Sequence, residues 1–87
     1  MPAPRSVRLF IKPGCPWCIE AVEWLDDHGV AYKVLDVIRD PVARAEMHDL
    51  TGQTRAPSLD ADGHILADFG ADELAAWWTR MGFGRVS

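Results

Sequence analysis

The sequence predicts a small α/β domain in which a four-stranded mixed sheet carries helices on both faces. Two observations predict it: strand and helix patterns follow the order β-α-β-α-β-β-α, and the pair Asp62-Gly63 separates the last two strands. A β-α-β start requires a parallel, right-handed crossover, whereas a two-residue hairpin adds antiparallel strands. The 87 residues suit one domain with a modest core, and residues 1–5 are expected to form a frayed tail.

Local patterns and end signals define each element. Strands are assigned where apolar and polar residues alternate or β-branched residues cluster, and helices where apolar residues recur at helical spacing. Gly29 and Gly52 follow the first two helices, where glycine readily takes a left-handed cap conformation. Asp40 before Pro41 is the signal of a helix start. The predicted strands cover residues 6–12, 30–37, 56–61 and 64–69, and the predicted helices cover 15–28, 41–52 and 72–81.

Some side chains can be assigned to the core or the surface. The second helix should turn Ala43, Met47 and Leu50 inward, and the last helix presents an apolar stripe that includes Trp77 and Trp78. Asp60 occupies a strand position that favours an apolar residue. Because an unpaired buried carboxylate is costly, we expect it to face solvent, with a proton relay to the cysteines as the alternative. The three histidines, His28, His48 and His64, are expected at the surface.

Composition excludes several classes of function. Nine Lys and Arg against thirteen Asp and Glu give a formal net charge of −4, which argues against a nucleic-acid-binding protein. No apolar run approaches the roughly 20 residues that a membrane span needs. The N-terminal residues do not form a charged segment followed by an apolar one, so no export signal is expected and the protein is predicted to be cytoplasmic.

The two cysteines form a single Cys15-Pro-Trp-Cys18 motif. A disulfide across two residues closes a very small loop and therefore stabilises a fold little. A structural zinc site wants four ligands, and the histidine spacings do not supply them, so no metal is expected. The pair is therefore predicted to act in chemistry rather than in architecture.

The motif lies where the first strand gives way to the first helix. The start of a helix leaves N–H groups unpaired and carries about half a positive charge, which favours the thiolate of Cys15 at the N-cap. Pro16 suits the first helical position, and Lys12 adds a nearby cation. Cys18 lies one turn further on and should be partly buried. We therefore expect Cys15 to attack and Cys18 to resolve. Trp17, between them, should be exposed and contact the substrate.

Three segments in this order resemble the glutaredoxins of the thioredoxin-like superfamily. They are Lys12-Pro-Gly-Cys15-Pro-Trp-Cys18, Gly52-Gln-Thr-Arg-Ala-Pro57 and Gly70-Ala-Asp-Glu-Leu74. The resemblance covers about residues 7–81 and implies a thioredoxin-like fold. It also implies a cis peptide bond before Pro57, and a backbone at Ala56 that pairs with an extended substrate.

The resemblance implies glutathione as cosubstrate, with no tightly bound cofactor. Lys12 and Arg55 would meet its glycyl carboxylate, and Ala71 and Asp72 would hold its γ-glutamyl end. The expected function is a monomeric, glutathione-dependent thiol–disulfide oxidoreductase acting on disulfide or glutathionylated client proteins. One alternative is a redoxin recharged by thioredoxin reductase. The other is a carrier of a glutathione-ligated [2Fe–2S] cluster, against which Pro16 argues because it stiffens the loop.

Overall fold

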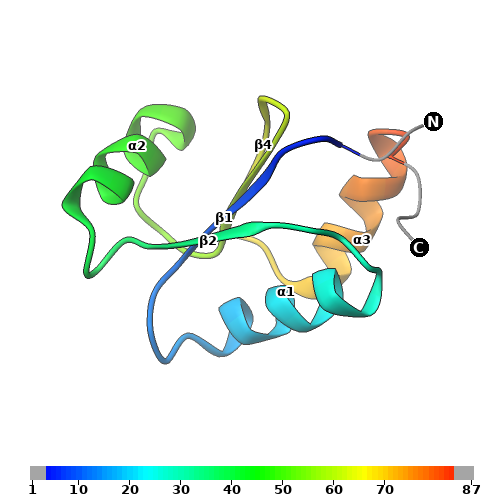
Figure 1. The fold of residues 1–87 in the computed structure, drawn as a ribbon, viewed down its shortest axis with the longest axis horizontal. Coiled ribbons are helices and arrows are strands. Elements are labelled where there is room, and N and C mark those ends of the chain that lie inside the picture. Colours follow the sequence, from blue (N-terminus) through cyan, green and yellow to red (C-terminus); the bar gives the residue numbers. More distant parts are fainter. Residues whose placement is uncertain (1–3, 84–87) are drawn as a thin grey trace.

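The computed structural model describes residues 4–83. Within them the elements follow the predicted order (Figure 1). The strands are β1 (Val7–Ile11), β2 (Lys33–Asp36), β3 (Ser58–Ala61) and β4 (His64–Ala67). The helices are α1 (Pro16–Asp27), α2 (Pro41–Thr51) and α3 (Ala71–Arg80). No helix among the described residues is long and apolar enough to cross a membrane.

The four strands form one mixed sheet in the order β2-β1-β3-β4. β1 runs parallel to β2, as the crossover through α1 requires, and antiparallel to β3, which pairs antiparallel with β4. Figure 1 shows α1 and α3 on one face of the sheet and α2 on the other. The predicted fold class is therefore confirmed. Because β1 is central, its C-terminal end delivers the chain to the start of α1 from the middle of the sheet.

Each face of the sheet has its own apolar core. The larger lies under α1 and α3 and includes Trp77 and Trp78, both 6% exposed. The smaller lies under α2 and has four buried members: Phe10, Val37, Ala43 and Met47. The prediction that Leu50 points inward is wrong, since it is 38% exposed. Ala43 and Met47 are the two residues with which α2 covers this small cluster. Leu50 lies in the last turn of α2, past the cluster.

Most of the predicted end signals act as expected. The Asp40 carboxylate accepts hydrogen bonds from the N–H groups of Val42 and Ala43, which caps α2. Asp62 and Gly63 both have positive φ, as a tight two-residue hairpin requires. The second strand is shorter than predicted. Val30 donates its N–H to the carbonyl of Leu25 over 3.0 Å, so it belongs to the closure of α1 rather than to the strand.

Asp60 does not face solvent and does not approach the cysteines, so both interpretations of it are wrong. It is 8% exposed, and its carboxylate accepts bonds from Arg8 Nη2 at 2.6 Å and from the Gly63 N–H at 2.8 Å. The Arg8 guanidinium also contacts Glu46 of α2 at 2.6 Å. This ion network joins β1, β3 and α2 under the smaller core, which is how a charged side chain can occupy a buried strand position.

The N-terminal tail is shorter than predicted. The N–H groups of Arg5 and Ser6 each donate to the Asp62 carboxylate over 2.8 Å. These bonds lower the pKa of Asp62 and hold the incoming chain against the hairpin turn. Of the tail predicted over residues 1–5, residues 1–3 lie outside the described residues.

Candidate functional site

Cys15 is the N-cap residue of α1, as predicted. Its backbone is extended, and its Sγ atom accepts a hydrogen bond from the N–H of Cys18 over 3.3 Å. Pro16 follows at the first helical position, where a missing N–H costs nothing. The Cys15 side chain is half-buried, so a disulfide can reach it from solvent. The loop and helix therefore present one accessible sulfur at the positive end of a helix.

Cys18 stands behind Cys15 and is 3% exposed. Burial, with a hydrogen bond to Cys15 as the second cause, raises the pKa of the Cys18 thiol to about 11. Both cysteines are free thiols. A buried, protonated sulfur beside an accessible one is the arrangement in which only the outer sulfur begins an exchange.

The loop before β3 lies beside the outer cysteine. The Sγ atom of Cys15 is 4.0 Å from the carbonyl oxygen of Ala56, and the Ala56–Pro57 peptide bond is cis, as the resemblance implied. Pro57 is buried, whereas Arg55 points outward and pairs with Asp68 at 3.3 Å. The structure therefore brings Ala56 and Pro57 to Cys15. The Arg55 side chain is 77% exposed and pairs with a carboxylate, and it does not line the pocket that contains Trp17, Ala71 and Asp72.

Three predicted substrate residues meet in one pocket. Trp17, which is 57% exposed, lines a cavity of about 250 Å³ together with Ala71 and Asp72 at the start of α3. The first intrahelical bond of α3 runs from the Leu74 N–H to the Gly70 carbonyl. The N–H groups of Ala71 and Asp72 therefore precede the helical ladder and can bind an anion.

The same pocket contains residues that sequence reasoning missed. Glu20, one turn after Trp17, and Glu73, whose carboxylate accepts from the Gly70 N–H over 3.3 Å, also line it. With Asp72 they make the pocket acidic. The spacing of Trp17 and Glu20 on one helix was the available signal, but it could not show that the start of α3 packs opposite them.

Lys12 lies on another side of the cysteines. It lines a cavity of about 210 Å³ with Cys15 and Cys18, and most of the remaining lining is apolar, from Ile11, Pro13, Ile19 and Val22. The Lys12 carbonyl accepts the N–H of Cys15 over 3.4 Å. The predicted substrate residues are thus divided between two pockets that flank the same sulfur.

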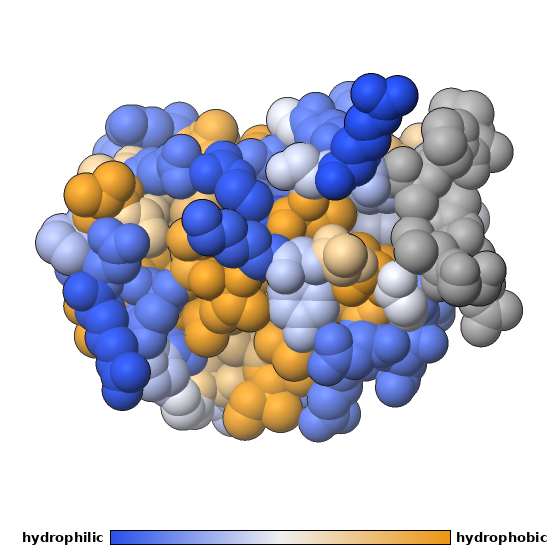
Figure 2. Space-filling view, in the orientation of Figure 1, coloured by the Kyte–Doolittle hydropathy of each residue, from blue (hydrophilic) through white to orange (hydrophobic). Residues whose placement is uncertain are grey.

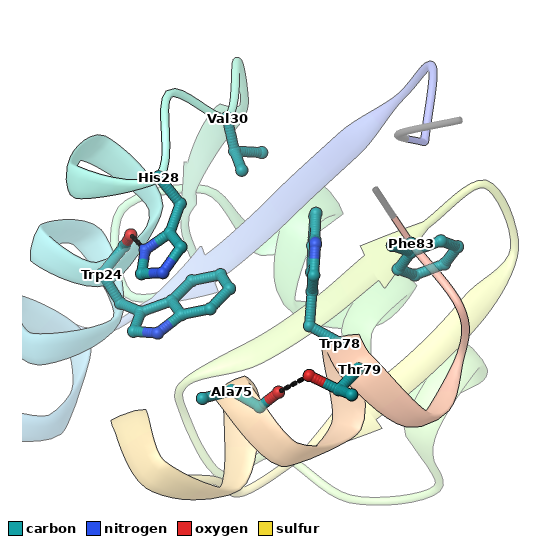
Figure 3. A pocket seen from close by; sticks show the side chains of 7 residues that line it. All are labelled: Trp24, His28, Val30, Ala75, Trp78, Thr79 and Phe83. Atoms are coloured by element: carbon teal, nitrogen blue, oxygen red, sulfur yellow. Dashed lines mark hydrogen bonds between the residues drawn. The ribbon is translucent and has the colours of Figure 1, made fainter. Parts of the chain in front are cut away.

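A cavity larger than these two lies elsewhere. It has a volume of about 410 Å³ and lies between α1 and α3, lined by Trp24, His28, Trp78 and Phe83 among others (Figure 3). His28 was expected at the surface, but it is half-buried. Its Nδ1 bonds to the Trp24 carbonyl at 2.8 Å, and its ring stacks on Trp24. No sulfur lines this cavity, so it is not the redox site.

Residues 4–83 contain no group of three or more His, Cys, Asp or Glu side chains that could hold a metal ion. His48 and His64 are exposed, as expected.

Comparison with known proteins identifies the family. The glutaredoxin family model matches residues 7–66, which span β1 through most of β4. The chain belongs to the glutaredoxin family. Glutaredoxin 3 of Escherichia coli is 30% identical over 77 residues, which cover 88% of this chain and 90% of that protein.

Solved structures agree with this glutaredoxin assignment. The thioredoxin-like protein BC3987 is 28% identical and superposes with a TM-score of 0.75, covering 82% of this chain and 97% of that one. A buckwheat glutaredoxin–glutathione complex has a TM-score of 0.67 at 22% identity, covering 87% of this chain and 69% of that chain. The glutaredoxin fold, with the Cys15-Pro-Trp-Cys18 segment at the start of α1, is that of a thiol–disulfide oxidoreductase.

Proposed function

We propose that this glutaredoxin is a cytoplasmic, monomeric, glutathione-dependent oxidoreductase that reduces glutathionylated proteins and protein disulfides. The single observation that supports it best is the pairing of an accessible Cys15 at the helix start with a buried Cys18 whose pKa is about 11. One sulfur is placed to attack, and the other stays protonated until it is needed.

The reaction on a glutathionylated client needs only the outer sulfur. The Cys15 thiolate attacks the glutathione sulfur, a Cys15–glutathione disulfide forms, and the client leaves as a thiolate that takes a proton from solvent. A second glutathione thiolate then attacks the mixed disulfide. It releases glutathione disulfide and restores Cys15, so each cycle consumes one free glutathione, and the glutathione taken from the client forms the other half of the glutathione disulfide.

A protein disulfide requires both sulfurs. Attack by Cys15 breaks the client disulfide and forms a mixed disulfide with one client sulfur. The Cys18 thiol, whose backbone N–H already donates to the Cys15 Sγ atom, then loses its proton and attacks that sulfur, which releases the client as a dithiol. Two glutathione molecules reduce the resulting Cys15–Cys18 disulfide. No metal or organic cofactor enters either route.

The proposed binding site for glutathione lies beside Cys15. The N–H groups that precede the α3 ladder would bind the γ-glutamyl carboxylate, Asp72 its ammonium, Ala56 its cysteinyl backbone and Lys12 its glycyl carboxylate. The fold shared with a buckwheat glutaredoxin crystallised with glutathione supports this placement. Trp17 would cover the bound tripeptide from the solvent side, since it lines the same pocket.

A specific observation favours a second source of electrons. Glu20, Asp72 and Glu73 line the pocket that would receive a carboxylate of glutathione, and Arg55 is already paired with Asp68. Such a pocket repels an anionic tripeptide. Thioredoxin reductase, which would reach the Cys15–Cys18 disulfide through its own thiols, is therefore the alternative partner.

The experiment compares the two electron sources on one disulfide. Reduction of hydroxyethyl disulfide is followed by NADPH oxidation, once with glutathione and glutathione reductase and once with thioredoxin reductase alone. The proposal expects turnover in the first mixture. Turnover only in the second would support the alternative, and no turnover in either would refute oxidoreductase function.

A further inference from the structure

An apolar cavity opens directly beside the reacting sulfur. It has a volume of about 210 Å³ and is enclosed by the end of β1, the loop over residues 12–14 and the first turns of α1. Ile11, Pro13, Ile19 and Val22 form most of its wall, with Lys12 and Glu23 as its charged members. Of its lining, the proposed routes use only the two cysteines and Lys12, and they give the apolar wall no role.

Apolar side chains are exposed on α1, whose first turns line the cavity, and on β2, which pairs with β1. Ile19 is 55% exposed, and Val34 on β2 is 44% exposed. Figure 2 shows an apolar band running over the middle and lower part of this face, where β2 and α1 lie. Isolated exposed apolar residues need no explanation, but an apolar surface on the helix that forms part of a cavity beside the reacting sulfur indicates an interaction surface.

The position of the cavity decides what can occupy it. Cys15 and Cys18 both line it, so a client that exchanges its disulfide with Cys15 brings its own chain to the mouth of the cavity. Pockets for drug-sized ligands usually span about 300–1,000 Å³, which is more than this cavity offers. It suits one branched aliphatic or aromatic side chain. β2 is also an edge strand, so an extended client segment can lie beside the band.

We propose that this cavity selects client proteins that carry a large apolar residue next to the reacting cysteine. The proposal rests on the thiol–disulfide exchange described above and specifies its substrate class. When the Cys15–client disulfide forms, the neighbouring apolar side chain enters the cavity and holds the client sulfur in line. Attack by Cys18 then breaks that disulfide and frees the client as a thiol.

The test uses two disulfide peptides that differ only at the residue next to the cysteine, leucine in one and serine in the other. We expect kcat/KM to be about ten-fold higher for the leucine peptide, since part of an apolar side chain is buried in the complex. In Ile19→Ser the ratio should fall toward one. In the control Val42→Ser, an equally simple change at a 75% exposed position on α2, it should stay at the wild-type value.

A second measurement needs no turnover. The rate constant of Cys15 with N-cyclohexylmaleimide is divided by its rate constant with N-(2-hydroxyethyl)maleimide. This ratio should be higher than the same ratio measured for free glutathione. In Ile19→Ser it should fall to the value for free glutathione. Equal kcat/KM for both peptides, or a preference that survives Ile19→Ser, overturns the proposal even if the maleimides are distinguished. Failure to reduce any disulfide, including hydroxyethyl disulfide, would instead refute the proposed function and the client selection that rests on it.

Discussion

The backbone N–H of Cys18 donates to the Sγ atom of Cys15 over 3.3 Å, so the two sulfurs of the motif differ in kind. The outer one receives a hydrogen bond from the helix start, which stabilises negative charge. The inner one is 3% exposed and is held as a thiol by burial. This asymmetry follows from one position in the fold, the junction of β1 and α1, and the first two predictions test it.

Alkylation should distinguish the two cysteines. With a Cys18 pKa of about 11, only about one molecule in ten thousand carries the Cys18 thiolate at pH 7. One equivalent of iodoacetamide should therefore modify Cys15 and leave Cys18 intact, as peptide mapping by mass spectrometry would show. The control is the unfolded protein, where both cysteines should react. Preferential labelling of Cys18 in the folded protein would reverse the assigned roles.

Stability should fall in alkali because of Cys18. Its folded pKa of about 11 lies above the ordinary value of 9.0, so the unfolded chain loses this proton first as the pH rises. The free energy of unfolding should be unaffected below pH 9 and decline by about 2 kcal/mol between pH 9 and 11. Urea unfolding of the reduced protein measures it. Cys18→Ser should lack this decline, while Tyr32, whose pKa is raised to about 12, contributes to both proteins.

Asp60 should matter for stability and not for exchange. Asp60→Ala removes the carboxylate that binds Arg8 and the Gly63 N–H, which should cost about 2–4 kcal/mol. Glu46→Gln, which removes the more exposed partner of Arg8, should cost about 1 kcal/mol or less. Chemical denaturation measures both. An Asp60→Ala protein that is folded but inactive in thiol–disulfide exchange would contradict the structural role and would support a proton relay from Asp60 to the cysteines.

The acidic pocket should weaken glutathione binding. Glu20→Gln removes one carboxylate from the pocket lined by Trp17 and Asp72, so the KM for glutathione should fall about two-fold. Asp49→Asn makes the same charge change at an exposed position on α2 and should leave that KM unaltered. Added salt should narrow the difference between wild type and Glu20→Gln. An equal effect of both substitutions would mean that net charge, and not this pocket, is responsible.

Sequence alone predicted the elements whose signals are local. Asp40 before Pro41 and the Asp62-Gly63 turn act within a few residues, so α2 and the hairpin lie where expected. The predictions for Asp60 and Leu50 were wrong because the surroundings of both residues come from distant segments. Arg8, which pairs with Asp60, lies 52 residues away in the sequence. The apolar cluster under α2 is small and does not extend to Leu50, which stays exposed. Local patterns carry no information on such partners.

In the candidate site, too, the features that depend on local spacing were predicted, and those that depend on distant segments were not. Cys15 as the N-cap and Cys18 as the buried sulfur follow from spacing along one helix, and the structure agrees. The acidity that Glu73 adds beside Trp17 depends on how α3 packs against α1, which spacing cannot show. The ion pair of Arg55 with Asp68 joins the segments before β3 and after β4, and a pattern along the chain does not show that these two side chains turn toward each other.

The most direct test of the account compares two single substitutions on a glutathionylated protein. Cys15→Ser should lose all detectable release of glutathione, because it removes the attacking sulfur. Cys18→Ser should retain release at a rate near that of the wild type, since that route needs only one sulfur, while losing reduction of protein disulfides. Release of glutathione from the labelled protein, with glutathione and glutathione reductase present, measures both. Equal loss in the two variants, or activity in Cys15→Ser, would contradict the division of labour between the two cysteines.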